Sequence, residues 1–330
     1  MKKIKGLMLM VAWITGALLL TSCGKKADKE VNIGYFNNIT HAQALYLKSQ
    51  GILENVLGEG MEVKWTAFNA GPAEVEALFS EHIDIGYIGP FPAINANVKS
   101  EGDVMLLTGA TKGGSVLVKR KDSGIASVKD LEGRKVAIPQ IGNTQHLCLL
   151  ALLQQYNLKP ETSGGTVIVS AVANADVENL MRRGDVDAAL VPEPWGATLI
   201  ENGAQLMLDY DQIYMNGDFD VAVVVVRREF MEEYPEIVEE FLKQHEAATV
   251  YINENKEEAM GIINEEIKAS TGKNLSESVL KEAFKRMEIN TDINKEAIHG
   301  FAEIARGLKY IRKMPQEETM YAEHIRDLLH

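Results

Sequence analysis

The sequence predicts an α/β protein with two similar lobes, followed by a helical C-terminal region. Three observations support this fold class. A unit of helix, strand and proline-containing loop occurs twice along the chain. Each half of the chain before residue 226 alternates strand and helix patterns, which is typical of α/β folds. Beyond that point apolar residues recur every three to four positions, as they do in helices.

The repeated unit is a helix that leads into a short strand and then a loop with two prolines. Its helical segments, 73–78 and 175–180, are 102 residues apart. The strands that follow them, 83–88 and 186–191, are 103 residues apart. Agreement through helix, strand and loop favours a duplicated unit over two unrelated αβ units of ordinary composition.

The two halves also open in the same way. Residues 31–36 and 135–139 have strand patterns, and each is followed by a polar loop and a helix. Thr40 in the first half, and Asn143 or Thr144 in the second, are the expected N-caps. Both halves therefore follow the order strand, loop, helix, strand, helix, strand, loop. This order predicts two lobes whose strand ends face one another.

The C-terminal region begins after a run of apolar residues, 221–226, which by its pattern is a fully buried strand. Charged residues in this region lie largely opposite the apolar ones, so we interpret their faces as solvated surfaces and not as binding patches. The expected helices are 228–234, 235–254, 256–268, 276–288, 295–314 and 317–329.

The N-terminus has the pattern of an export signal. Residues 1–22 combine a short basic start with an uncharged run, 6–22, whose 17 residues are at the short limit for crossing a bilayer. The segment 20–23 (LTSC) resembles the lipobox of bacterial lipoproteins, in which the cysteine is lipidated and becomes the first residue of the mature chain. We expect a lipoprotein signal peptide, lipidation at Cys23 and a polar tether over 23–30. An ordinary signal peptide or a signal anchor is the alternative.

Charge and cysteine content limit the partners. Removing the signal peptide takes away three lysines and no acids, so the net charge moves from -13 to -16. An acidic chain argues against nucleic acid and against anionic lipid surfaces as partners. If Cys23 carries lipid, Cys148 stands alone and no internal disulfide can form. The apolar run around Cys148 favours a core residue over a reactive thiol.

Catalytic and metal-binding motifs are absent from the sequence. There is no GxSxG, HExxH, CxxC or P-loop, and the seven histidines show no metal-ligand spacing. We therefore expect a protein that is not an enzyme and that has no cofactor and no metal site. His41 and His146 differ from the other histidines, because each lies in the first turn of a helix that follows a strand.

Helix starts in both lobes predict a binding site for an anion. Such starts offer free backbone N–H groups and the positive end of the helix dipole. Nearby amide and hydroxyl groups are neutral donors, which suit an oxyanion such as sulfonate, sulfate or nitrate. Helix capping explains each of these residues singly, but four starts on one rim favour a ligand. The residues assigned to these starts and their loops are Asn37, Asn38, Thr40, His41, Asn69, Gly71, Gly89, Pro90, Gly113, Asn143, Thr144, Gln145 and His146.

Three further residues are candidates for shaping the ligand site. Phe91 and Trp195 occupy corresponding loops, where they form aromatic walls for an organic ligand or pack in the core. Glu193 follows a strand directly, where it accepts from an ammonium or hydroxyl group of the ligand. A carboxylate beside an anion site repels the anion unless the ligand also carries a donor or cation. The alternative for Glu193 is a solvent-exposed helix cap.

Two motifs resemble a known family. Residues 137–145 (AIPQIGNTQ) and 187–195 (DAALVPEPW) resemble the substrate-binding lipoproteins of the nitrate/sulfonate/taurine class of ABC importers. The similarity runs from about 31 to 311 and includes 127–136, a segment common in many binding proteins. This resemblance implies the type II periplasmic-binding-protein fold, in which two lobes joined by two crossovers close over the ligand as rigid bodies.

The resemblance also implies how the chain divides. We place the crossovers near 118–119 and 220–221. Lobe I is then expected to comprise 31–118 and 221–330, and lobe II 119–220. The helical C-terminal tail is expected to pack back on the first lobe.

The function implied is that of a lipid-anchored solute-binding protein in the cell envelope, facing the periplasm or the exterior. It captures a small organic anion, an aliphatic sulfonate or taurine, and delivers it to an ABC permease with its ATPase. We expect a monomer with no nucleic-acid partner. The alternative ligands are a thiamine-precursor pyrimidine or other neutral heterocycle, and nitrate. No cluster of charged residues marks a specialist for inorganic anions, and Lys112 either supplies one positive charge or faces solvent.

Replacing Cys23 with Ala tests the anchor. The variant should lose lipidation and signal-peptide processing at this site, because in a lipobox the cysteine carries the lipid. Several acyl chains together give stable anchoring, whereas one chain binds only marginally. Metabolic labelling with a fatty acid and fractionation of cells measure both effects. A variant that is cleaved and retained as the wild type is would show that the lipoprotein interpretation is wrong.

Overall fold

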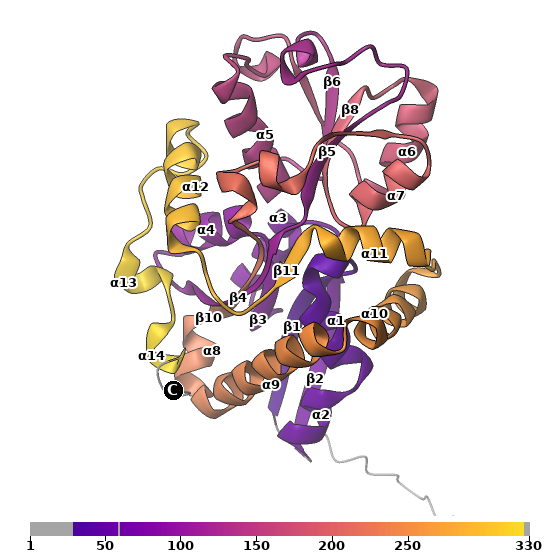
Figure 1. Ribbon diagram of the computed structural model, residues 1–330. Coiled ribbons are helices and arrows are strands. Elements are labelled where there is room, and N and C mark those ends of the chain that lie inside the picture. Colours follow the sequence, from indigo (N-terminus) through magenta and orange to yellow (C-terminus); the bar gives the residue numbers. More distant parts are fainter. Residues whose placement is uncertain (1–28, 59, 327–330) are drawn as a thin grey trace, which may run out of the picture.

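The computed structural model describes residues 29–58 and 60–326, which form two α/β lobes, one above the other (Figure 1). Each lobe contains one β-sheet with helices packed around it. Within the described residues, no helix is both long enough and apolar enough to cross a bilayer. The predicted signal peptide and Cys23 lie outside the described residues. Residues 29 and 30, predicted as the end of the tether, belong to the first strand.

Lobe I is built on a six-stranded sheet. Its strands are β1 (Lys29–Phe36), β2 (Met61–Phe68), β3 (Ile85–Ile88), β4 (Val104–Gly113), β10 (Asp220–Arg227) and β11 (Met287–Ile289), in the order β11-β4-β10-β3-β1-β2. β1, β2 and β3 are parallel, whereas β10 is antiparallel to both of its neighbours. The helical elements between these strands are η1 (Ile39–His41), α1 (Ala42–Ser49), α2 (Ile52–Leu57), α3 (Gly71–Phe79) and α4 (Pro90–Lys99).

Lobe II is built on a five-stranded sheet. Its strands are β5 (Ser115–Lys119), β6 (Lys135–Ile138), β7 (Ile168–Ala171), β8 (Ala188–Pro192) and β9 (Gln205–Leu208), in the order β7-β6-β8-β5-β9. β6, β7 and β8 are parallel, and β5 is antiparallel to β8 and β9. Its α-helices are α5 (Thr144–Gln155), α6 (Asn174–Arg183) and α7 (Trp195–Glu201).

The two sheets share one arrangement, as expected for the predicted duplicated unit. Three parallel strands, β2-β1-β3 in lobe I and β7-β6-β8 in lobe II, are followed by an antiparallel strand that enters from the other lobe. The helices after equivalent strands correspond as well: α1 with α5, α3 with α6, and α4 with α7. Helices that follow parallel strands begin at the carboxyl ends of those strands, so each lobe gathers its helix starts at one edge.

The first connection between the lobes lies earlier than we expected. Only Gly114 separates β4, in the sheet of lobe I, from β5, in the sheet of lobe II. The chain therefore crosses at residue 114 and not at 118–119, because residues 115–119 already pair with β8. The second connection, 209–219, ends at β10, next to the expected crossing at 220–221.

The C-terminal region is mainly helical, as predicted, but its boundaries differ. Residues 287–289 form β11 and not the end of a helix, because they pair with the exposed edge of β4. A residue with left-handed backbone, Lys309 (φ 64°), follows the helix that we expected to continue to residue 314. The helices are α8 (Arg228–Glu233), α9 (Pro235–Glu254), α10 (Lys256–Thr271), α11 (Glu277–Lys285), α12 (Lys295–Gly307), α13 (Glu317–Met320) and α14 (Glu323–Arg326).

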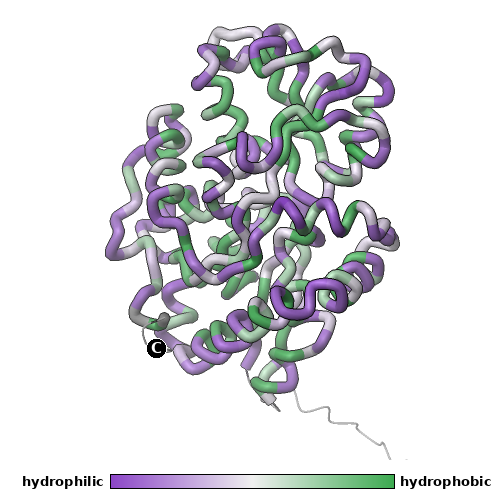
Figure 2. The backbone as a smooth tube through the Cα atoms, viewed as in Figure 1, coloured by the Kyte–Doolittle hydropathy of each residue, from purple (hydrophilic) through white to green (hydrophobic). Residues whose placement is uncertain are grey.

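The tail packs on the first lobe, as predicted, and it also touches the second. α9 and α10 cover α1 in lobe I, α11 packs on α7 in lobe II, and α12 packs on α4 of lobe I and on α5 of lobe II (Figure 1). Apolar residues concentrate inside both lobes and hydrophilic residues on the outside (Figure 2). β10 lies in the middle of this core, since every residue of the strand except Arg227 is buried.

A buried carboxyl group lies inside lobe I without a hydrogen-bond partner. Glu74, in the first turn of α3, is fully buried, and neither of its carboxyl oxygens makes a hydrogen bond within the described part of the chain. Gly34 and Gly86, which pair across β1 and β3, make room for it: a Cβ atom on Gly34 would lie 2.3 Å from Glu74 Oε1. Burial raises the pKa of Glu74 well above its usual value, because it favours the neutral acid over the carboxylate.

Replacing Glu74 with Leu should stabilise the protein at alkaline pH. The folded-state pKa is raised, so the stability of the wild type should fall as the pH rises from about 4.5, the ordinary pKa, towards the folded-state value. The leucine variant lacks this loss and should gain about 1–3 kcal/mol in the free energy of unfolding. Denaturant unfolding at a series of pH values from acid to alkaline measures the free energy of unfolding of both proteins. The matched control is Glu76→Leu, which changes an exposed carboxylate on the same helix. Equal pH dependence for wild type and Glu74→Leu would contradict this account.

Candidate functional site

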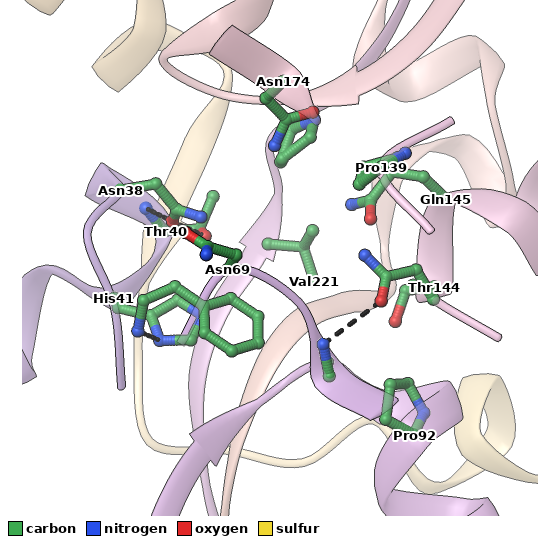
Figure 3. A pocket seen from close by; sticks show the side chains of 15 residues that line it. Asn38, Thr40, His41, Asn69, Pro92, Pro139, Thr144, Gln145, Asn174 and Val221 are labelled. Carbon is green, nitrogen blue, oxygen red and sulfur yellow. Dashed lines mark hydrogen bonds between the residues drawn. The ribbon is translucent and has the colours of Figure 1, made fainter. Parts of the chain in front are cut away.

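A cavity lies between the lobes, where helix starts from both sheets meet (Figure 3). The space between its lining atoms is about 390 Å³, including its opening to solvent. The lining residues come from both lobes and from β10, and none of them is charged. They are Phe36, Asn38, Thr40, His41, Asn69, Gly71, Gly89, Pro92, Pro139, Asn143, Thr144, Gln145, Asn174, Pro192 and Val221.

The wall from lobe I is shaped by an N-cap. Asn38, and not the expected Thr40, caps η1, and its Oδ1 accepts hydrogen bonds from the backbone N–H and the hydroxyl of Thr40. The carbonyl of Thr40 accepts from the Thr111 hydroxyl at 2.8 Å. Asn38 and Thr40 are both buried. These bonds hold the start of η1 and α1 against the cavity.

The wall from lobe II is shaped by the start of α5. Asn143 occupies the N-cap position, but its Oδ1 accepts from the backbone N–H of Gly71, in the other lobe, at 3.2 Å. The Thr144 hydroxyl accepts from the backbone N–H of Phe91 at 3.4 Å. Gln145 Nε2 donates to the Ser115 hydroxyl at 3.1 Å. The start of α5 is therefore hydrogen-bonded to the starts of α3 and α4 across the cavity.

Two lining glycines allow this close approach. A Cβ atom on Gly71 would lie 2.3 Å from Cγ of Pro92, and one on Gly89 would lie 2.4 Å from the Thr144 hydroxyl oxygen. Neither position has space for a side chain. The proposed role of Gly71 in close backbone approach therefore has a steric basis in this structure.

The two histidines in the first turns are both neutral. His41 lines the cavity, stacks on Phe36 and accepts the Phe36 backbone N–H at Nδ1, 3.1 Å away. His146 accepts the Gly142 N–H at Nδ1 in the same way but does not line the cavity. Burial lowers the pKa of His41 to about 3 and that of His146 to about 4. Because Nδ1 accepts in each ring, the proton lies on Nε2.

Nine of the sixteen residues that we assigned to ligand binding line the cavity: Asn38, Thr40, His41, Asn69, Gly71, Gly89, Asn143, Thr144 and Gln145. The other seven lie elsewhere: Asn37, Pro90, Phe91, Gly113, His146, Glu193 and Trp195.

The two aromatic residues belong to the packing of the lobes. Phe91 is fully buried in the core, and Trp195 is partly buried against the core of lobe II. Phe36 supplies the aromatic contact with the cavity instead. Gly113 precedes the first connection, and Lys112 forms an ion pair with Asp218 at 3.1 Å without lining the cavity.

Glu193 is not a solvent-exposed cap, because it is fully buried. Its Oε2 accepts from the backbone N–H of Ala197, in the first turn of α7, at 2.9 Å, and its Oε1 pairs with Arg286 at 3.1 Å. Burial raises the pKa of Glu193, while the Ala197 N–H and the Arg286 guanidinium lower it. Both carboxylate oxygens are engaged by the protein itself.

Six lining residues were missing from our assignment: Phe36, Pro92, Pro139, Asn174, Pro192 and Val221. Most follow a strand or begin a helix next to a residue that we did assign. Asn174 is the most informative, because it begins α6, the counterpart of α3, whose start we had assigned. The duplicated unit was thus the signal for it.

The chemistry of the cavity is that of neutral donors and helix dipoles. Helices α1, α3, α4, α5 and α6 all begin at or next to lining residues, so the positive ends of several dipoles converge on one space. Among the described residues there is no group of three or more histidine, cysteine, aspartate or glutamate side chains that suits a metal ion. The arrangement therefore suits an anion held by hydrogen bonds.

Comparison with known proteins assigns the family. A model described as the NMT1-like family matches residues 24–264. The chain belongs to the NMT1-like family. Its relatives include the taurine-binding periplasmic protein of Escherichia coli, 32% identical over 185 residues, a match that covers 56% of this chain and 55% of that protein. Another relative, provisionally named an aliphatic sulfonates-binding protein, of Bacillus subtilis, is 29% identical over 87% of this chain and 85% of its own.

Solved structures agree on the fold. The alkanesulfonate-binding protein of Xanthomonas axonopodis pv. citri, solved bound to MOPS, matches with a TM-score of 0.74 and 18% identity over 88% of this chain and 98% of that chain. The predicted periplasmic-binding-protein fold and the resemblance to sulfonate- and taurine-binding proteins are thus confirmed. The names of these proteins describe binding proteins and not enzymes.

Both imidazoles should stay neutral at physiological pH. Their folded-state pKa values, about 3 for His41 and about 4 for His146, lie below the ordinary 6.5. Their contribution to stability should therefore be complete above pH 6.5 and be lost as the pH falls towards those values. Side-chain ¹H–¹⁵N correlation spectra over a pH titration measure the charge state and the tautomer. A His41 ring that gains its proton near pH 6.5 would contradict the buried geometry.

Proposed function

We propose that this protein is the solute-binding component of an ABC importer, and that its cavity captures a small sulfonate-like anion between the lobes. An aliphatic sulfonate or taurine is the expected ligand class. The loaded protein delivers the anion to a permease with its ATPase. We expect it to act as a monomer, anchored in the cell envelope by lipid on Cys23.

The observation that carries this proposal is the convergence of helix starts from both lobes on a space without charged side chains. Backbone N–H groups at such starts bind oxyanions, and the dipoles favour the negative charge. Side-chain donors from Asn38, Thr40, Asn143, Thr144 and Gln145 border the same space. No carboxylate lines the cavity, so none repels an anion there.

An organic anion fits better than a bare inorganic one. Phe36, Val221 and three prolines supply apolar surface among the lining residues. The relatives named for taurine and aliphatic sulfonates support the same class of ligand.

One lining residue favours a ligand that also carries a donor. The Oδ1 atom of Asn174 is buried and makes no hydrogen bond within the described residues. A buried acceptor without a partner costs about 1–3 kcal/mol, which a ligand amine or hydroxyl would recover. This supports an aminosulfonate such as taurine over an unsubstituted alkanesulfonate, and it gives Asn174 the acceptor role that we had expected of Glu193.

A neutral heterocycle, such as a thiamine-precursor pyrimidine, is the second candidate. The observation in its favour is that amides, which both donate and accept, form much of the lining. A neutral ligand would need no helix dipole, so the charge dependence of binding separates the two candidates.

Replacing Gln145 with Glu should weaken the binding of taurine by at least about tenfold, because it places a negative charge beside the anion in a site of low dielectric. Gln155→Glu makes the same change at an exposed position on the same helix and should leave affinity unchanged. Calorimetric titration of both variants with taurine and with an alkanesulfonate measures this. Binding of a pyrimidine but of neither sulfonate by the wild type would favour the neutral heterocycle, and equal affinities for all three proteins would remove Gln145 from the site.

A further inference from the structure

The turn that joins the lobes is held from both sides. Gly114 donates its backbone N–H to the carbonyl of Arg286, in the C-terminal tail, at 2.8 Å. Its own carbonyl accepts from the backbone N–H of Glu193, in lobe II, also at 2.8 Å. Gly113 and Gly114 have left-handed backbones (φ 71° and 67°), and a Cβ atom on Gly113 would lie 2.6 Å from the Arg286 carbonyl oxygen. The first connection is thus pressed between the tail and lobe II.

The side chains of the same two residues bond to one another. Arg286 Nη1 lies 3.1 Å from Glu193 Oε1, and Arg286 Nε lies 3.0 Å from Asp209 Oδ1. Asp209 begins the second connection between the lobes and caps its first turn by accepting the Tyr210 N–H. One guanidinium therefore reaches lobe II and the second connection, while its main chain holds the first.

Burial gives this ion pair its strength. Glu193 is fully buried, and the side chain of Arg286 is 11% exposed. Loss of the guanidinium would leave the Glu193 carboxylate buried with only the Ala197 N–H as partner, and breaking a buried pair in this way is costly. The neighbouring pairs Lys281–Glu277 and Lys285–Glu282 have exposed side chains and contribute little.

The pair is sensitive to the relative orientation of the lobes. Arg286 lies between α11, which packs on α7 of lobe II, and β11, which pairs with β4 in the sheet of lobe I. Glu193 follows β8 directly, so its position is fixed to the sheet of lobe II. Pro192, the last residue of β8, lines the cavity. A rotation of one lobe against the other would stretch the pair and move this part of the wall.

We propose that Arg286 is a positioning residue for ligand binding: with Glu193 it forms a clasp at the meeting point of the two connections that favours the closed arrangement of the lobes. Neither Glu193 nor Arg286 lines the cavity, and the clasp raises affinity by keeping the binding-competent arrangement populated. The affinity part of this inference rests on the proposed function, whereas the effect on lobe orientation does not.

The test compares lobe separation with affinity. Spin labels at Ser80 in lobe I and Glu161 in lobe II, both exposed, report the distance between the lobes by pulsed electron resonance. In the wild type, taurine should shift the distances towards the shorter one. Arg286→Ala should shift the ligand-free distances further towards the longer one, and its affinity for taurine should fall about tenfold. Arg286→Lys keeps the charge and should recover part of both effects. Lys285→Ala, next to it on the surface, should match the wild type.

The possible results of this experiment either support or overturn the clasp. A variant that melts earlier but keeps the wild-type distance and affinity would overturn the clasp and leave a structural ion pair. If Arg286→Ala fails to fold, Glu193→Gln, which keeps the side-chain volume, takes its place with the same expected distances. If the wild type binds no sulfonate, the proposed ligand is wrong, and the distances in the ligand-free protein still support or overturn the clasp.

Discussion

The direction of the parallel strands is the constraint on which the site depends. In both sheets the parallel strands end at the edge that faces the other lobe, and the helices that follow them begin there. Backbone N–H groups that have no partner inside their helices therefore collect in one space from two directions. Hydrogen bonds such as Gly71 to Asn143 then join the two rims. The cavity is a consequence of the duplicated unit, because a single lobe would offer only half of its donors.

The protein keeps formal charge away from this space. Burial keeps His41 neutral, and in Glu74, in the first turn of α3, it favours the neutral acid over the carboxylate. Glu193 directs its carboxylate to Arg286 and to the start of α7. An anion in the cavity would thus meet dipoles and amides, with no counter-ion and no opposing carboxylate among the lining residues. Such a site discriminates by hydrogen-bond geometry more than by net charge, which fits ligands that carry a donor at one end.

Local patterns in the sequence predicted most of the fold and part of the site. The periods of β1, α3, β3 and their counterparts in lobe II are visible in the sequence, and asparagine or threonine before a helix marks its start. Features that depend on contacts between distant parts of the chain could not be predicted from local patterns. β11 is three residues long and forms because the edge of β4 is available, a pairing across about 175 residues of chain. We predicted that Glu193 binds the ligand, because its ion pair with Arg286, 93 residues away, is not visible in the local sequence. Phe91 has the residue type of an aromatic wall, but packing in the core decides its place.

Hydrogen exchange with and without taurine is the most direct test of a site built from both lobes. The account predicts that taurine slows amide exchange at the starts of α1 and α5 together, since each contributes donors to one ligand. The helices α9 and α10, which cover α1 on its other side, should change little. Slower exchange in only one lobe, or at neither helix start, would contradict a ligand held between them.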